Sequence, residues 1–179
     1  MLNVGIINIT GYAGAEIARL VYSHPELKLV SATGRSKAGK DLSEVFPHLE
    51  KTDIKIREEL SDNVEFVFSA LPHAASAEKL SQYVDSSIPA IDISADFRLK
   101  DLSTYEDWYD IKHPRPELIN QATYGLPEIH RDDIKKSKLV ANPGCFPTGA
   151  ILSMSPAVKN DLIEDMIIVD SKTGVSGAG

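Results

Sequence analysis

The sequence is poor in cysteine, in positive charge and in long apolar runs. A single cysteine, Cys145, occurs in 179 residues, which excludes an internal disulfide and CxxC-type metal sites and leaves its thiol free. Nineteen Lys and Arg against 26 Asp and Glu give a net charge of −7, so most of this surface repels nucleic-acid phosphates. Apolar runs fall short of the roughly 20 residues of a membrane span, and no basic leader precedes the first predicted strand. We therefore expect a cytoplasmic protein that binds neither nucleic acid nor membrane.

Strand-like and helix-like segments alternate along the chain. Short apolar segments typical of buried strands occur at residues 3–9, 27–32, 54–57, 65–69, 90–93, 138–141 and 166–170. Helices are predicted at residues 13–23 and 74–84. This alternation predicts an α/β fold, with a mostly parallel sheet covered by helices on both faces. Residues 97–131 are less regular, with a short helix predicted at 104–109, and are expected to form an excursion above the sheet.

Cys145 lies within residues 142–148, Asn-Pro-Gly-Cys-Phe-Pro-Thr. A lone cysteine is most often a small buried hydrophobe. Here a predicted strand precedes it and the apolar opening of a helix follows it, so the thiol falls at a strand-to-helix turn. Unpaired N–H groups and the helix dipole at such a turn favour a thiolate, which can attack an acyl carbon, and can hold the oxyanion that forms. We interpret Cys145 as a catalytic nucleophile.

A glycine turn follows the first predicted strand. Gly11 lets the backbone approach a pyrophosphate, and Gly14 lets the helix pack closely on the strand, beside the positive end of the helix dipole. The dinucleotide fingerprint GxGxxG is matched only in part, because Ile9 occupies its first glycine position. A glycine turn that binds no ligand is the alternative.

Basic residues follow the second predicted strand. Cofactors without a 2′-phosphate are usually held at this position by Asp or Glu, whereas this chain has Gly34, Arg35 and Ser36. The guanidinium of Arg35 can clamp a phosphate and the hydroxyl of Ser36 can donate a hydrogen bond to it. The pattern favours NADP(H) over NAD, with a solvated basic turn as the alternative.

Other polar residues follow further predicted strands, at the edge where ligands collect in such sheets. His73 is a candidate general base or a helix cap. Asp92, Asp96 and Arg98 are candidate ligand contacts, and a buried ion pair between Asp96 and Arg98 is an equal alternative. The charged run 57–59 is expected to form a solvated face.

Six motifs taken together resemble N-acetyl-gamma-glutamyl-phosphate reductase. They are residues 10–14 (Thr-Gly-Tyr-Ala-Gly), 69–73 (Ser-Ala-Leu-Pro-His), 94–99 (Ser-Ala-Asp-Phe-Arg-Leu), 124–128 (Tyr-Gly-Leu-Pro-Glu), 142–148 and 174–179 (Gly-Val-Ser-Gly-Ala-Gly). The resemblance implies a Rossmann-type NADP-binding domain at residues 1–145 and, at residues 146–179, the beginning of an α+β catalytic domain like that of glyceraldehyde-3-phosphate dehydrogenase. It also implies the NADPH-dependent reduction of an acyl phosphate, N-acetyl-gamma-glutamyl phosphate, to the semialdehyde in arginine biosynthesis.

The resemblance also assigns roles to residues. Cys145 is the nucleophile that forms a thioester. The cofactor-binding residues are Thr10, Gly11, Tyr12, Ala13, Gly14, Gly34, Arg35 and Ser36. The substrate-binding residues are Asn142, Arg98, Ser176 and Gly177. Where this chain has Asn8-Ile9 the family usually has Gly-Ala, but Asn tolerates left-handed backbone, so we expect cofactor binding to be retained.

The family's sequences are longer than this chain, and its catalytic histidine falls beyond residue 179. We therefore expect these residues to be part of a longer homo-oligomeric enzyme and to be inactive alone. Two alternatives remain: the related reductase of carrier-bound aminoadipyl phosphate in lysine biosynthesis, and a non-catalytic dinucleotide-binding module. Aspartate-semialdehyde dehydrogenase resembles this chain less at residues 94–99 and 124–128.

Overall fold

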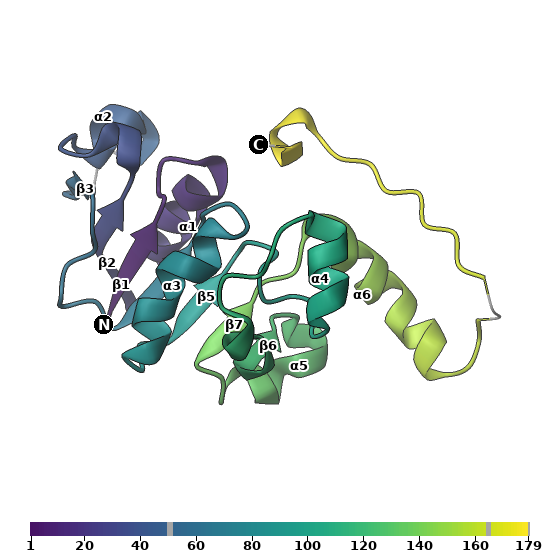
Figure 1. Cartoon of the computed structure of the whole chain (residues 1–179). Coiled ribbons are helices and arrows are strands. Elements are labelled where there is room, and N and C mark those ends of the chain that lie inside the picture. The colour runs from purple at the N-terminus through teal and green to yellow at the C-terminus, as the bar shows by residue number, and fades with distance from the viewer. Residues whose placement is uncertain (50–51, 164–165, 179) are drawn as a thin grey trace.

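The computed structural model, which describes residues 1–49, 52–163 and 166–178, contains a central parallel sheet (Figure 1). Within these residues the sheet has seven strands in the order β3-β2-β1-β4-β5-β7-β6, and every neighbouring pair is parallel. The strands are β1 (Leu2–Ile7), β2 (Leu27–Thr33), β3 (Ile56–Arg57), β4 (Phe66–Ser69), β5 (Ala90–Asp92), β6 (Ala122–Tyr124) and β7 (Leu139–Ala141). The predicted α/β class is confirmed, and all strands end at one edge of the sheet.

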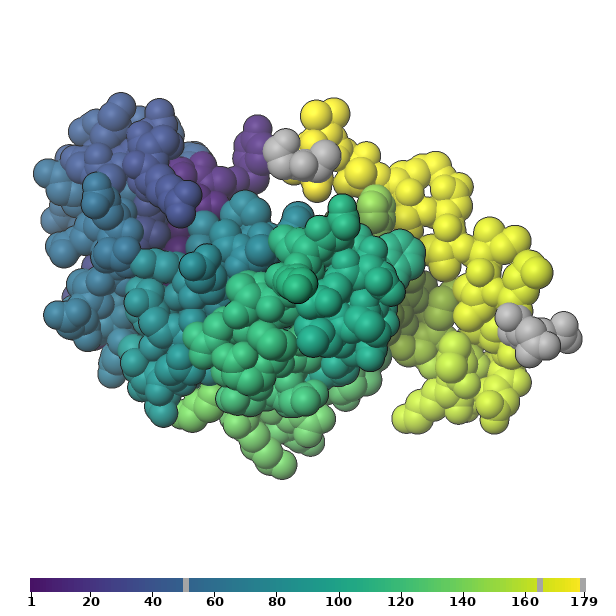
Figure 2. Space-filling view, viewed as in Figure 1, coloured from purple at the N-terminus to yellow at the C-terminus, as the bar shows by residue number. Residues whose placement is uncertain are grey.

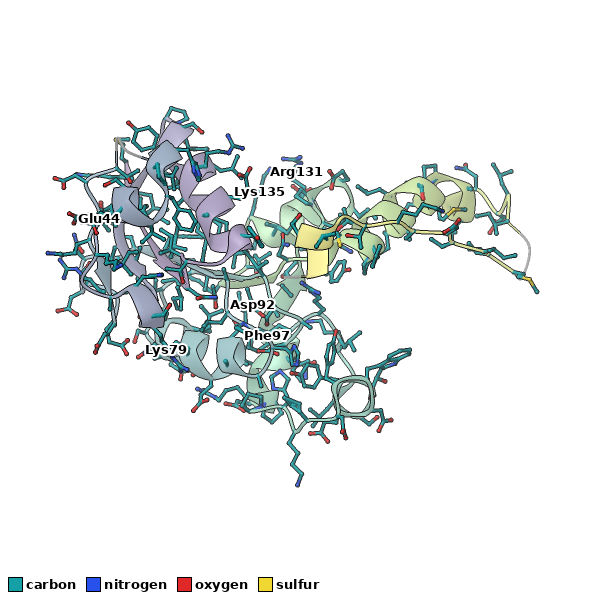
Figure 3. All side chains as sticks on the ribbon, turned by 90° about the horizontal axis from the view of Figure 1, so that it is seen from above. Glu44, Lys79, Asp92, Phe97, Arg131 and Lys135 are labelled. Atoms are coloured by element: carbon teal, nitrogen blue, oxygen red, sulfur yellow. The ribbon has the colours of Figure 1, made fainter. Side chains whose placement is uncertain are left out.

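Helices cover both faces of this sheet. The helices of the described residues are α1 (Tyr12–Ser23), α2 (Leu42–Val45), α3 (Ala75–Asp85), α4 (Leu102–Tyr109), α5 (Pro127–Ile134) and α6 (Cys145–Lys159), of which α6 has no buried residue, and the 3₁₀ turns are η1 (Arg35–Lys37), η2 (Pro47–Leu49), η3 (Pro116–Gln121) and η4 (Val175–Ala178). Seen from above, α1 and α3 lie on opposite faces of the sheet (Figure 3). This arrangement is the two-sided covering that a parallel sheet requires.

The apolar side chains of β1 divide the core into two layers. Successive residues of a strand point to opposite faces, so Val4 and Ile6 pack in one layer with Ala18 of α1. Ile7 belongs to the other layer, which includes Leu80 of α3. A strand buried on both faces must be apolar along its length. The two layers together hold β1 and β4 at the centre of the sheet, where the carboxyl ends of both strands are fixed in position.

The predicted strand at residues 166–170 is wrong. These residues form no strand and all of them are exposed, with Ile168 at 87%. An extended segment without a neighbouring strand gains no ladder hydrogen bonds, so an apolar pattern alone does not make it part of a sheet. In the space-filling view, the segment that follows α6 stands away from the sheet over much of its length (Figure 2).

The last part of the predicted excursion belongs to the sheet instead. β6 pairs in parallel with β7, and α5 connects the two strands. The sequence contained one signal for α5, because Pro127 occupies its first turn, where a missing N–H costs nothing. β6 has only three residues and no strand-like run around it, so its pairing depends on β7.

Candidate functional site

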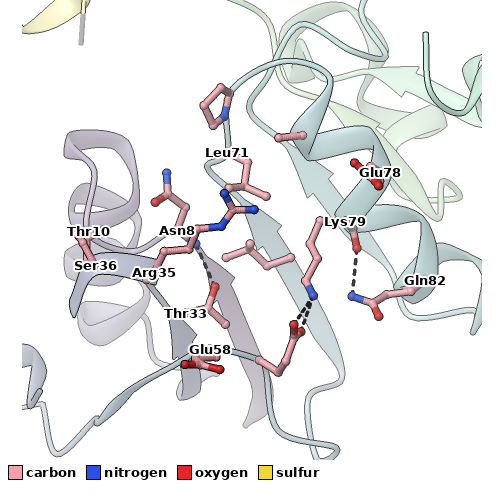
Figure 4. Close-up of a pocket in the computed structure, with 15 residues that line it drawn as sticks. Asn8, Thr10, Thr33, Arg35, Ser36, Glu58, Leu71, Glu78, Lys79 and Gln82 are labelled. Atoms are coloured by element: carbon pink, nitrogen blue, oxygen red, sulfur yellow. Dashed lines mark hydrogen bonds and ion pairs between the residues drawn. The ribbon is translucent and has the colours of Figure 1, made fainter. Parts of the chain in front are cut away.

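A cleft of about 630 Å³ opens at the carboxyl edge of the sheet (Figure 4). It lies where the strand order reverses, because β1 pairs with β2 on one side and with β4 on the other. Ligands of such sheets bind in the crevice outside the strand ends at this reversal. The lining comes from the ends of four strands and from α3, and includes Asn8, Thr10, Gly34, Arg35, Ser36 and Lys79.

The turn between β1 and α1 forms the floor of the cleft. Asn8 has φ of 62°, a left-handed conformation that Asn adopts more readily than most residues, as expected for this replacement of glycine. Its side-chain amide donates to the Ala70 carbonyl oxygen over 2.8 Å, which joins the ends of β1 and β4. A Cβ on Gly14 would lie 2.4 Å from the Asn8 carbonyl oxygen. Gly14 is therefore required for the close packing predicted between helix and strand.

The end of β2 supplies the basic side of the cleft. Gly34 packs against Thr10 so closely that an added Cβ would lie 2.6 Å from its Cγ2 atom. Arg35 and Ser36 follow in η1, and both are exposed and line the cleft. Among the ion pairs of the described residues, none involves Arg35. Its guanidinium is therefore open to an anionic ligand.

The opposite side of the cleft was not predicted from the sequence. Leu71 and Pro72 follow β4 and line it, and so does Lys79 of α3. The Lys79 ammonium donates to both carboxylate oxygens of Glu59, with an Nζ–Oε1 distance of 2.6 Å. The Glu59 side chain is 64% exposed, in agreement with the predicted solvated face, but it also lines the cleft, from the segment that follows β3. The two residues are 20 positions apart, so no local motif links them.

Cys145 begins α6 directly after the turn that follows β7, as predicted. Its thiol is free and exposed. The helix is preceded by Gly144, which provides no side-chain cap, while the Thr148 N–H and hydroxyl both bond to the Gly144 carbonyl oxygen. The N–H groups of Cys145 and Phe146 belong to the first turn, whose donors have no partner within a helix. The thiol thus lies where the backbone offers hydrogen-bond donors to an anion.

Arg98 and Asn142 meet beside this turn. Arg98 Nε donates to the Asn142 carbonyl oxygen over 2.8 Å, and its Nη2 atom donates to the Ile93 carbonyl oxygen over 2.6 Å. Its Nη1 atom lies against Gly144, 3.1 Å from where a Cβ would be. The guanidinium therefore joins the end of β5 to the residues that precede Cys145.

The alternative of a buried ion pair between Asp96 and Arg98 is wrong, because Asp96 has other partners. The Asp96 carboxylate accepts hydrogen bonds from the N–H groups of Ala74 and Ala77, over 2.7 and 2.8 Å, and from the Tyr105 hydroxyl over 2.8 Å. It caps the start of α3 from a distant loop, which satisfies two N–H groups that a helix leaves unpaired. Asp96 thereby fixes the helix that carries Lys79.

A second buried carboxyl supports the same loop. Asp92 accepts hydrogen bonds from the hydroxyls of Ser76 and Ser94, over 2.5 and 2.7 Å. Burial raises the pKa of the Asp92 carboxyl above its usual value, although these hydrogen bonds act in the opposite direction. Ser76 belongs to α3 and Ser94 precedes Asp96, so this network connects the same helix and loop.

The remaining predicted residues are not gathered at the cleft. The His73 ring packs on Tyr109, with centroids 5.4 Å apart, and the side-chain cap of α3, which was the alternative role for His73, comes from Asp96. Tyr12 is 71% exposed at the start of α1. Gly11 and Ala13 lie in the same turn and, like Tyr12, are absent from the cleft lining. Ser176 and Gly177 lie in η4, and no hydrogen bond within the described residues joins them to Arg98, Asn142 or Cys145.

No group of three or more His, Cys, Asp or Glu side chains in the described part of the chain is arranged to hold a metal ion. Across the same residues, no helix combines the length and apolar character needed to cross a bilayer.

A parallel sheet whose strand order reverses beside a cleft of this kind is the architecture of dinucleotide-binding proteins. Residues 3–137 match the family model described as semialdehyde dehydrogenase, NAD binding domain, and residues 145–179 match the one described as semialdehyde dehydrogenase, dimerisation domain. The first match covers most of the chain. The protein therefore belongs to the semialdehyde dehydrogenase family.

Similar sequences carry the name N-acetyl-gamma-glutamyl-phosphate reductase. One from Dehalococcoides mccartyi is 54% identical over 175 residues, covering 98% of this chain and 51% of the relative. One from Methanosphaera stadtmanae is 48% identical over 180 residues, covering 99% of this chain and 52% of the relative. The chain thus spans about half the length of the curated relatives it matches.

The fold is also similar to a solved structure, that of aspartate semialdehyde dehydrogenase with NADP from Candida albicans. The TM-score is 0.63 at 16% identity, over 91% of this chain and 48% of that chain. At this identity the similarity supports the fold, in agreement with the strand order.

Proposed function

We propose that this protein acts in the NADPH-dependent reduction of N-acetyl-gamma-glutamyl phosphate to N-acetyl-glutamate 5-semialdehyde and phosphate, in the cytoplasmic pathway of arginine biosynthesis. The observation that carries the proposal is the exposed thiol of Cys145 at the first residue of α6. The strand that precedes Cys145, β7, lies three positions from β1 in the sheet. At the usual strand spacing this is a distance of about 14 Å. The relatives that carry this enzyme's name, at up to 54% identity, support the substrate.

The thiolate of Cys145 would attack the acyl carbon of the substrate. A carbon–sulfur bond forms, the bond from that carbon to the phosphate oxygen breaks, and phosphate leaves with its electron pair, so that a thioester remains. The N–H groups of Cys145 and Phe146 would hold the oxyanion of the intermediate. Arg98 lies against the same turn, and with Asn142 it is proposed to orient the acyl phosphate. Ser176 and Gly177 stay predicted substrate contacts.

We propose that the cleft binds NADP(H). Gly14 and Gly34 leave no room for a Cβ, which keeps the chain close to the strand ends, and Arg35 lies where a 2′-phosphate is bound in such folds. We propose that Gly34, Arg35 and Ser36 contact the adenosine 2′-phosphate and that Thr10 lies beside the pyrophosphate. Gly11, Tyr12, Ala13 and Gly14, at the start of α1, would present its N-terminus to the pyrophosphate. When bound, the reduced cofactor supplies the hydride that converts the thioester to the aldehyde and releases the thiolate.

The division of the chain follows the same proposal. Residues 1–145 would form the cofactor-binding domain, and residues 146–179 would begin the catalytic domain. Residues 145–179 match a dimerisation domain, and apolar side chains such as Phe146, Leu162 and Met166 are exposed there. We therefore propose that the complete protein is a homo-oligomer, which light scattering on the complete gene product would test. A monomer at micromolar concentration would contradict this part of the proposal.

The reverse reaction of the complete gene product tests the function. We expect phosphate-dependent reduction of NADP with N-acetyl-glutamate 5-semialdehyde, and its loss in Cys145→Ala. Cys145→Ser provides a second variant of nearly the same shape, whose melting temperature shows whether the fold is retained. A folded protein that binds NADP but does not use this aldehyde would contradict the proposed substrate, and the aminoadipyl substrate of lysine biosynthesis would be tested next.

A further inference from the structure

The ion pair between Lys79 and Glu59 spans the cleft that Arg35 also lines. Lys79 lies in the second turn of α3, whereas Glu59 lies in the segment that follows β3. Both side chains line the same cleft as Arg35 and Ser36 (Figure 4). The pair thus connects two walls of the region that, under the proposed function, receives the adenosine half of the cofactor.

The charges that line this region are predominantly acidic. Glu58, Glu59 and Glu78 contribute carboxylates, and only Arg35 and Lys79 contribute cations among the residues that line the cleft in the described chain. A phosphate monoester carries a charge of about −1.5 to −2 at neutral pH, so each carboxylate repels it and each cation attracts it. The Lys79 and Glu59 side chains are 32% and 64% exposed, so solvent weakens these forces without removing them. The tolerance of the cleft for a 2′-phosphate therefore depends on whether Glu59 is neutralised.

We propose that the ion pair of Glu59 and Lys79 sets the selection between NADP(H) and NAD(H). Lys79 offsets the charge of Glu59 and so permits a 2′-phosphate beside Arg35, whereas Glu59 limits how strongly that phosphate is held. This inference rests on the proposed cofactor-binding function of the same cleft. It adds determinants from α3 and from the end of β3 to the turn at residues 34–36, and neither residue is assigned a part in the chemical step.

Calorimetric titration of the complete gene product with NADPH and with NADH tests the pair without requiring activity, because the two ligands differ only in the 2′-phosphate. Lys79→Met should weaken NADPH binding about tenfold and change NADH binding by less than about twofold. Glu59→Gln should strengthen NADPH binding about threefold, because it removes a carboxylate and leaves Lys79 available. The double variant should return close to the wild-type ratio, because both charges are gone.

Two further variants make the outcomes separable. Lys135→Met removes an exposed lysine that pairs with Asp132 on α5, outside the cleft lining, and should leave the NADPH-to-NADH ratio unchanged. Arg35→Met should lower that ratio if the cleft binds NADP(H) as proposed.

If Arg35→Met lowers the NADPH-to-NADH ratio and Lys79→Met does not, the ion-pair inference is overturned and the proposed function survives. If Arg35→Met leaves it unchanged, the assignment of NADP(H) itself fails. Equal weakening of both cofactors in Lys79→Met would give the pair a purely structural role and also overturn the inference.

Discussion

The guanidinium of Arg98 holds the main chain of Asn142, with Nε donating to the Asn142 carbonyl oxygen over 2.8 Å. The same side chain bonds the Ile93 carbonyl oxygen, so it joins the ends of β5 and β7, which are neighbours in the sheet. Gly144 provides no side-chain cap for α6. Arg98 therefore supplies, from another loop, the restraint that the turn before Cys145 lacks locally.

Arg98→Met should lower the free energy of unfolding by about 3 kcal/mol, because it removes two hydrogen bonds from a charged donor and leaves two carbonyl groups unpaired. It should also slow alkylation of Cys145 by iodoacetamide in the folded protein. The N–H groups of the turn favour the reactive thiolate, and without Arg98 they are less well held in position. Urea unfolding and the alkylation rate measure the two effects. Arg98→Lys keeps the charge but lacks the planar guanidinium, so its stability and its alkylation rate should fall between those of the wild type and of Arg98→Met. Wild-type values of both quantities in Arg98→Met would show that these hydrogen bonds contribute nothing.

Gly14→Ala should destabilise the protein by about 3 kcal/mol, at the upper end of the range for an overpacked core. The added Cβ would lie 2.4 Å from the Asn8 carbonyl oxygen and 2.7 Å from the Ile9 Cα atom. Both contacts are with backbone that belongs to the β1–α1 turn, so neither can move aside without displacing the floor of the cleft. Thermal unfolding measures the loss.

Gly149→Ala is the matched control, since a Cβ there would meet nothing within 4 Å and the residue lies inside α6. It should be neutral or stabilise the protein by up to about 1 kcal/mol through helix propensity. Equal effects of the two substitutions would mean that the close approach at Gly14 does not limit stability.

The sequence predicted the elements that carry their own signal. β1, α1 and β2 end within two residues of their predicted limits, because mainly apolar patterns bounded by glycine and polar residues indicate buried elements. Residues 166–170 have an equally apolar pattern and form no strand, since strand formation requires a neighbour that a local pattern does not supply. β6 shows the converse, because three residues, too few to indicate a strand by themselves, join the sheet once β7 offers a partner.

The candidate site was predicted to a similar extent. The turn of Cys145 and the residues at the end of β2 were found because a nucleophile and a basic turn follow strands directly. Lys79 was missed, because its partner Glu59 is 20 residues away and both lie in ordinary charged surroundings. Asp96 was singled out, but its role as a cap depends on Ala74, 22 residues earlier, which only the folded loop brings close.

Asp96→Asn should lower the free energy of unfolding by about 3 kcal/mol, because one carboxylate oxygen is replaced by an amide that faces a backbone donor in a buried site. Tyr105→Phe removes a single donor to the same carboxylate and should cost less, about 1–2 kcal/mol. Hydrogen exchange of the amides of Ala74 and Ala77 distinguishes the two, since Asp96→Asn should speed it more than Tyr105→Phe does. Unchanged exchange in Asp96→Asn would contradict the assignment of the cap.

The cap of α4 predicts a specific dependence on pH. Asp101 accepts hydrogen bonds from the Ser103 hydroxyl over 2.6 Å and from the Thr104 N–H over 2.7 Å, and these bonds lower the pKa of the Asp101 carboxyl from 3.8 to about 2. Because the pKa in the folded protein lies below that of the unfolded chain, the carboxylate stabilises the fold fully above the unfolded value. That contribution is lost as the pH falls from about 4 toward 2.

Asp101→Asn cannot titrate, so the stability advantage of the wild type over this variant should be constant between pH 5 and 7 and shrink below pH 4. Urea unfolding of both proteins across this range measures the difference. A carboxyl ¹³C titration of Asp101 in the folded protein supplies the independent check, because a midpoint at or above 3.8 would show that the cap does not favour the carboxylate.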